Sequence, residues 1–109
     1  MVKRYIPKQG DIIYLDFNPT KGHEQTAIVI SNNIFNKNTK MVIVCPITSN
    51  EKEYPTHYIL EDSKKIYGAV LCEHIRSIDY EIRNVSFIEK ASDNDLISVV
   101  MLMNACIEE

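Results

Sequence analysis

Three adjacent polar residues, His23, Glu24 and Gln25, could carry out acid–base chemistry. A histidine or a carboxylate can transfer a proton near neutral pH, and an amide beside it can hold a polar ligand. The same triplet is also typical of a solvated hairpin loop, and taken alone it favours that simpler interpretation. The triplet is therefore a candidate site only if other residues join it.

Two further clusters could contact a phosphate or a ribose. Thr48, Ser49 and Asn50 follow an apolar run, so their hydroxyl and amide groups could orient a phosphate or a ribose hydroxyl, although such residues also end strands. His74 and Arg76 interrupt a later apolar stretch and could bind phosphate, but pairing of Arg76 with Glu73 or an aspartate is an equal alternative.

Signatures of other chemistries are missing from the sequence. It contains no P-loop, zinc-ligand spacing or GxSxG nucleophile motif, so we predict no metal ligands and no cofactor. Cys45, Cys72 and Cys106 lie in apolar surroundings, which favours reduced, buried, structural cysteines in a cytoplasmic protein.

Short strands must position these clusters. Alternating side chains predict a strand over residues 10–17, a turn over 18–22 and a second strand over 26–31. A helical turn capped by residues 31–33 and a polar loop over 36–40 follow. The remaining strands are expected at 41–45, 56–60 and 85–89, and over 68–78 as one strand or as two bent about Cys72 and Glu73.

The last element is predicted to be a helix that begins at Ser92. Serine is a good N-cap, and Asp95 occupies the capping-box position. Apolar residues cover most of the helix circumference, so it needs more than one surface to cover it. Met101 and Met103 could pack in the core or contact a second subunit.

Composition and order of elements set the fold class. With 109 residues the chain is predicted to be a single domain over residues 1–109, and the net charge of −3 argues against non-specific nucleic-acid binding. No run is apolar enough to span a membrane, and no signal peptide is apparent. Short strands followed by one helix favour a mainly β (α+β) fold, a small antiparallel barrel with a C-terminal helix and short appended helices.

Taken together, these stretches resemble the MazF/PemK family of toxin ribonucleases. The resemblance covers nearly the whole chain, and the joint order and spacing of its motifs carry it. The matching stretches are residues 4–5, 10–11, 16–19, 22–25, 46–49, 54–55, 68–70 and 73–79 and the terminal helix.

The resemblance implies an SH3-like barrel that dimerises, cleaves single-stranded RNA at short sequences without metal, and is neutralised by a MazE-type antitoxin. Such cleavage needs a deprotonated 2'-OH, stabilisation of charge on the phosphate and a proton for the leaving oxygen. Thr48 and Glu24 match the family's catalytic positions. We expect Gln25, His23, Ser49 and Asn50 to bind substrate, with a plain surface role as the favoured alternative for His23.

The sequence departs from the family pattern directly after Gln25. The family reads G-x-E-Q, a few small residues and Arg-Pro before the next strand, whereas here Thr26 follows Gln25 at once. Either an Arg-bearing loop exists but is too mobile to be placed, or the deletion is real and the protein is impaired in catalysis. We favour the mobile loop, because the rest of the site framework is complete.

Three functions from different classes remain. The leading one is a sequence-specific endoribonuclease toxin acting as a homodimer. The second is a catalytically impaired form that binds RNA or antitoxin without cutting. The third, a gyrase poison of the CcdB type, is disfavoured by the residues at 22–25 and 46–48. An acidic antitoxin tail could lie over the basic loops and fold as it binds.

Overall fold

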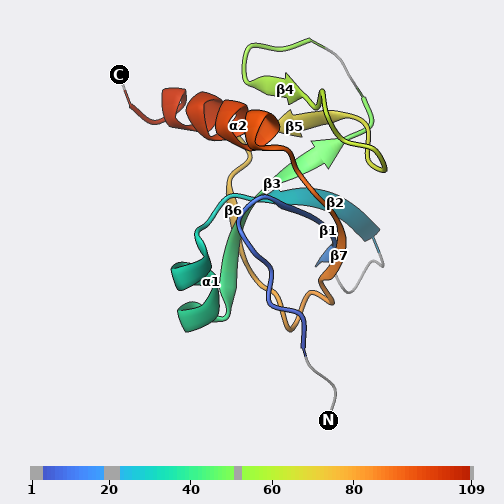
Figure 1. Ribbon diagram of the computed structural model, residues 1–109, viewed down its shortest axis with the longest axis vertical. Helices are drawn as coiled ribbons and strands as arrows, with labels where there is room; N and C mark the ends of the chain where they lie inside the picture. The colour runs from blue at the N-terminus through green and yellow to red at the C-terminus, as the bar shows by residue number, and fades with distance from the viewer. Residues whose placement is uncertain (1–3, 19–22, 51–52, 109) are drawn as a thin grey trace.

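Seven strands form one antiparallel sheet in the computed structural model. The structure describes residues 4–18, 23–50 and 53–108, without the side chains of residues 17, 18, 23 and 24. The sheet order is β4-β5-β3-β2-β1-β7, and β6 also pairs with β3 (Figure 1). The strands are β1 (Asp11–Asn18), β2 (His23–Val29), β3 (Met41–Thr48), β4 (His57–Ile59), β5 (Ala69–Leu71), β6 (Arg76–Asp79) and β7 (Ser86–Lys90).

The predicted antiparallel β fold with a C-terminal helix is confirmed, but the barrel is not closed. Within the described residues, β4 and β7 are the two ends of the sheet and do not pair with each other. The stretch 68–78 forms two strands, β5 and β6, separated by the turn at Cys72 and Glu73. Both strands pair with β3, whose full length runs further than the predicted 41–45.

Two helices complete the described fold. α1 (Asn33–Thr39) begins at Asn32, whose side chain accepts a hydrogen bond from the Phe35 amide at 2.9 Å. The prediction of a polar loop over residues 36–40 was wrong, because the buried Asn36 amide donates to the Pro7 carbonyl at 3.0 Å and holds this polar stretch helical. α1 ends at Lys40, which adopts a left-handed conformation with φ of 59°.

The C-terminal helix α2 (Asp93–Ala105) lies beside β4, at the end of the molecule opposite the start of the described chain (Figure 1). Ser92 caps it as predicted, accepting a hydrogen bond from the Asp95 amide at 3.0 Å. Met103 packs against the core, whereas Met101 is 67% exposed, so only one of the two methionines faces outward.

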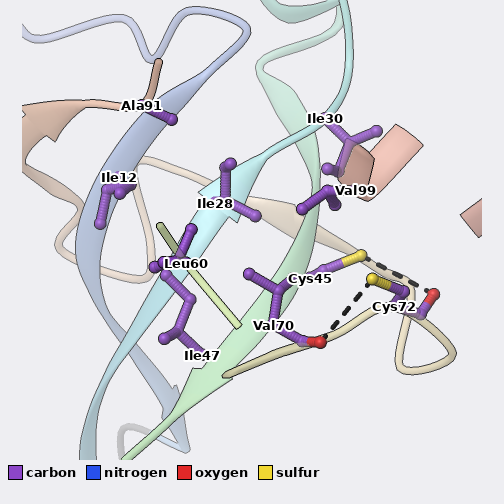
Figure 2. Packing of buried hydrophobic residues seen from close by; sticks show 10 residues of the cluster. All are labelled: Ile12, Ile28, Ile30, Cys45, Ile47, Leu60, Val70, Cys72, Ala91 and Val99. Carbon is purple, nitrogen blue, oxygen red and sulfur yellow. Dashed lines mark hydrogen bonds between the residues drawn. The ribbon is translucent and has the colours of Figure 1, made fainter. Parts of the chain in front are cut away.

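Both faces of the central strands are buried. Ile12 and Ile28 belong to a cluster that packs against α2 through Val99, and Figure 2 shows this cluster. The alternate residues Ile13 and Val29 face a second cluster on the other side. Since neighbouring residues of a strand point to opposite faces, this double burial explains the uninterrupted apolar runs at residues 12–13, 27–30 and 41–47.

The cysteines are partly as predicted. All three are free, and Cys45 and Cys72 lie side by side in the first cluster, where burial raises the pKa of each thiol to about 12 (Figure 2). Cys106 is exposed at the end of α2, so the prediction that it is buried was wrong.

The segment between β4 and β5 is held by two carboxylates. Asp95 is fully buried and accepts hydrogen bonds from the Tyr58 hydroxyl at 2.6 Å and from the amides of Glu61 and Asp62 at 3.2 and 3.0 Å. The Glu89 carboxylate accepts from three successive backbone amides, at residues 64–66, at 2.8 to 2.9 Å. These bonds fasten the segment to α2 and to β7.

The strand register answers the question of the missing loop. β2 passes through Gln25 and Thr26 without interruption, and these residues pair with Leu15 and Tyr14 on β1. Consecutive pairing leaves no room for an inserted loop between Gln25 and Thr26, so the mobile-loop explanation was wrong and the shortened hairpin belongs to the fold. The predicted turn at 18–22 lies largely outside the described residues.

Within the described residues, no helix is long and apolar enough to cross a membrane.

Candidate functional site

Thr48 lies at the end of β3, where the strand leaves the core. Its backbone pairs with Ala69 on β5, and the preceding Gly68 passes close to it. Gly68 has a φ of 148°, and a Cβ at this position would lie 2.2 Å from the Thr48 carbonyl oxygen. Only glycine therefore permits this approach, which fixes the backbone that carries Thr48.

A groove of about 410 Å³ opens beside Thr48. β1, β2, β3 and β5 contribute to its lining, together with the residue that follows β3. The lining includes Tyr14, Gln25, Thr26, Thr48, Ser49 and Leu71. The hydroxyl groups of two threonines and a serine and the amide of Gln25 thus share one hollow with the ring of Tyr14, an arrangement suited to a polar ligand that also has flat rings.

Hydrogen bonds orient both threonines. The Thr48 hydroxyl accepts from the Asn50 amide at 3.2 Å, and the Thr26 hydroxyl donates to the Ile47 carbonyl at 3.4 Å. An accepting bond leaves the Thr48 hydroxyl proton available to donate to a ligand oxygen. Thr48 is therefore placed to hold an anionic or hydroxyl oxygen in the groove.

The structure brings together Gln25, Thr48 and Ser49 among the residues that the sequence indicated. Asn50 is not among the described lining residues, and its recorded bond to Thr48 comes from its backbone. His23 and Glu24 lie on β2, paired with Asn18 and Asp16, but their side chains are outside the described part of the chain.

Sequence reasoning did not find Tyr14, Thr26 or Leu71. Their residue types are ordinary for strands, and only the register places them together. Tyr14 pairs with Thr26, and Thr26 pairs with Ile47 on β3. No local signal marks them, since Thr26 is simply the first residue of the strand predicted at 26–31.

The groove lacks a described cation. No Lys or Arg is among its described lining residues, and Arg4 forms an ion pair with Glu81 at 3.3 Å. Stabilising a doubly charged phosphate intermediate normally requires a cation or several donors. In the described part of the site, hydroxyl and amide donors alone are available for that work.

Glu73 and His74, singled out from the sequence, form a second polar cluster beside the groove. Glu73 accepts from the Thr56 hydroxyl at 2.8 Å, lies 3.2 Å from His57 Nε2 and lies 3.6 Å from His74 Nε2. Burial alone would raise the pKa of Glu73, but its hydrogen bonds and the His57 charge outweigh burial and lower it. His57 pairs with Leu71, so this cluster adjoins the groove wall.

Comparison with known proteins places this chain in a family. The family model described as "PemK-like, MazF-like toxin of type II toxin-antitoxin system" matches residues 8–105. The chain therefore belongs to the PemK-like, MazF-like toxins of type II toxin–antitoxin systems.

Individual relatives agree with this assignment. The endoribonuclease toxin MazF of Escherichia coli K12 is 37% identical over 90 residues, which cover 79% of this chain and 80% of that protein. The endoribonuclease toxin ChpB of the same strain is 31% identical, with 99% of this chain and all of ChpB covered.

Solved structures give the same answer for the fold. MazF from Deinococcus radiodurans superimposes with a TM-score of 0.86 at 30% identity, covering 95% of this chain and 98% of that chain. A MazE–MazF structure from the same organism gives a TM-score of 0.87 at 30% identity, covering 94% of this chain and 97% of the other.

Proposed function

We propose that this chain is a sequence-specific endoribonuclease toxin that cleaves single-stranded RNA and is neutralised by a MazE-type antitoxin. The observation that carries the proposal is the groove at the end of β3, where Thr48, Ser49 and Gln25 meet on a fold that belongs to this toxin family. The relatives named above as endoribonucleases support the same reaction class.

The proposed reaction is attack of a ribose 2'-OH on the adjacent phosphate without metal. The 2'-OH loses its proton, the new P–O bond forms, and the 5'-oxygen leaves with a proton, which yields a 2',3'-cyclic phosphate. Thr48 would donate to a phosphate oxygen or orient the 2'-OH. Glu24 would transfer a proton, while Gln25, Ser49, Asn50 and His23 would hold the substrate, with a surface role as the alternative for His23.

We also propose that residues 1–109 act as one domain in a cytoplasmic homodimer. The outer face of α2 supports the dimer, because Ile97 is 57% exposed and Met101 is 67% exposed on adjacent turns. An unpartnered apolar helix face is typical of a surface that another subunit covers.

A second candidate function is binding of RNA or antitoxin without efficient cleavage. The unbroken pairing of β1 with β2 through Gln25 and Thr26 favours it, because the family's Arg-bearing loop has no place in this hairpin. Losing one such group for the developing charge typically lowers the rate on the order of a hundredfold or more.

The test is incubation of the purified protein with a mixed-sequence RNA in the presence of a chelator. We expect fragments that end in 2',3'-cyclic phosphate, and roughly a hundredfold slower cleavage by Thr48→Ala. Equal rates for the two proteins would remove Thr48 from the mechanism. RNA binding without any cleavage would favour the second candidate, and in that case an Arg-bearing loop inserted between Gln25 and Thr26 should restore turnover.

A further inference from the structure

Tyr14 separates the Thr48 groove from a second hollow. Its side chain is 44% exposed on β1, although its neighbours Ile13 and Leu15 are fully buried. Tyr14 lines the groove and also a smaller hollow of about 230 Å³. An exposed aromatic ring shared by two hollows is a natural surface for stacking a nucleobase.

The second hollow is lined by polar side chains from two distant parts of the chain. Asp16 comes from β1, whereas Asn84 and Ser86 come from the turn before β7 and from its first residue. The Asp16 amide donates to the Arg83 carbonyl at 2.9 Å, which fixes this turn against β1. Asn84 has a left-handed backbone with φ of 52°, a conformation that asparagine tolerates better than most residues.

The hollow is rich in acceptor oxygens, beside the hydroxyl groups of Tyr14 and Ser86, which can also donate. Asn84 Nδ2 donates to Asp16 Oδ2 at 3.4 Å. The second carboxylate oxygen of Asp16 and the amide oxygen of Asn84 are then left as acceptors, and both residues line the hollow. The volume falls below the ~300–1,000 Å³ typical of pockets for drug-sized ligands, which suits a single flat ring.

We propose that this hollow is a nucleobase pocket, in which Tyr14 stacks on one base of the RNA and Asp16 and Asn84 accept hydrogen bonds from its exocyclic amine. The inference rests on the proposed function, because the groove on the other side of Tyr14 would hold the reacting phosphate. Asp16 and Asn84 are specificity residues, since they contact the base and not the reacting atoms.

The acceptor-rich lining predicts which bases fit. Adenine, cytosine and guanine each carry an exocyclic amine, and carboxylate and amide oxygens accept from such groups. Uracil has no exocyclic amine, and its edge carries two carbonyl oxygens on either side of a single N3–H. At least one of these oxygens would face the acceptors of Asp16 and Asn84 unfavourably. The pocket should therefore discriminate against uracil at one position near the cleaved bond.

The first experiment maps cleavage of a randomised RNA library by sequencing the product ends. Asn84→Gly removes the amide while its left-handed backbone stays favourable, and Asp16→Asn removes the charge. Each should weaken the base preference at a single position roughly tenfold. Lys40→Gly is the matched control, because Lys40 also has a positive φ but lies at the end of α1, outside this hollow. Unchanged preferences in both pocket variants, with normal folding, would overturn the proposal.

The second experiment separates this pocket from the cleavage reaction. The chain contains no tryptophan, so Tyr14→Trp introduces a single tryptophan at the stacking position, whose emission can be excited apart from that of the remaining tyrosines. Short oligonucleotides of A, C or G should quench its emission at roughly tenfold lower concentration than U, and Asn84→Gly should remove the difference. Equal quenching by all four would reject the pocket even if the protein cleaves RNA. Base-dependent quenching without cleavage would support the pocket while the nuclease proposal fails.

Discussion

Two polar regions of this protein differ in how their hydrogen bonds are used. The buried carboxylate of Asp95 and the half-buried carboxylate of Glu89 accept hydrogen bonds from donors within the same chain. Around Thr48, the recorded bonds are few and longer, at 3.2 and 3.4 Å, and the hydroxyls face a groove. Polar groups satisfied within the chain stabilise the fold, whereas polar groups that face a groove remain free to bind a ligand.

The largest expected effect is at Asp95. Asp95→Ala leaves the Tyr58 hydroxyl and two backbone amides without their acceptor in a partly buried place, which should cost about 2–3 kcal/mol of unfolding free energy. Urea denaturation measures the loss. Asp93→Ala, on the same helical turn but exposed, is the control and should change stability by less than ~0.5 kcal/mol. Similar losses in both variants would contradict a special role for Asp95.

The second-largest effect is expected at Gly68, which lies between the segment held by Asp95 and Glu89 and the groove at Thr48. Gly68→Ala places a Cβ against the Thr48 carbonyl and should cost about 2 kcal/mol of stability through strain and backbone displacement. Because the displaced backbone carries Thr48, RNA cleavage should fall even under conditions in which the variant is folded. Gly10→Ala is a useful comparison, since its nearest contacts are the ends of flexible side chains. Full activity of folded Gly68→Ala would show that Thr48 tolerates the shift.

The third effect is a pH dependence at Glu89. Burial would raise the pKa of Glu89, but the amide donors of residues 64–66 and the Lys65 charge lower it. A lowered pKa means that the stabilisation is present above the ordinary glutamate pKa of about 4.3 and is lost as the pH falls through the folded-state value. Glu89→Gln should be about 1 kcal/mol less stable than the wild type at pH 7.

The difference in unfolding free energy between the wild type and Glu89→Gln should shrink as the pH falls from 5 to 3. Glu73 also has a lowered pKa, but both proteins keep it, so the difference isolates Glu89. Glu53→Gln, at an exposed position, serves as the control. If this difference in unfolding free energy stays constant over the pH range, the carboxylate charge of Glu89 does not contribute to stability.

The smallest expected effect on stability is at the groove. Thr48→Ala loses one bond from the Asn50 amide at an exposed site and should change the unfolding free energy by less than ~0.5 kcal/mol. The same substitution should slow RNA cleavage strongly. Thermal denaturation and cleavage rates of one protein preparation test both statements. A large loss of stability would show that Thr48, like Asp95 and Glu89, stabilises the fold, and would weaken its assignment to the site.

Much of the fold could be predicted from local patterns. Alternation identified β1, the apolar run at 41–45 identified β3, and the serine–aspartate spacing identified the start of α2. The predictions failed where tertiary contacts outweigh local preference. Asn36 is held in α1 by a bond to Pro7, which is far away in sequence. Cys106 is exposed because the C-terminal end of α2 extends beyond the core, so that residues 104–108 are all exposed.

The lining of the candidate site was predicted in part, for the same reason. The hydroxyl group of Thr48 and the amide of Gln25 are recognisable by type and position, so the sequence indicated both. Tyr14 and Leu71 enter the groove through strand register, which depends on pairing between segments that are far apart in sequence. The hydrogen bonds of Asp95 could not be predicted either, since the sequence indicated only its position near the start of a helix.

The sequence by itself determined the family, the order of strands and helix, and the residue types at the end of β3. These follow from local spacing and side-chain chemistry. Tertiary structure alone decided that β2 pairs with β1 without interruption through Gln25 and Thr26, that no described cation lines the groove, and that Tyr14 lines two hollows. Each of these depends on which strands lie side by side, a property of the folded chain that no local stretch carries.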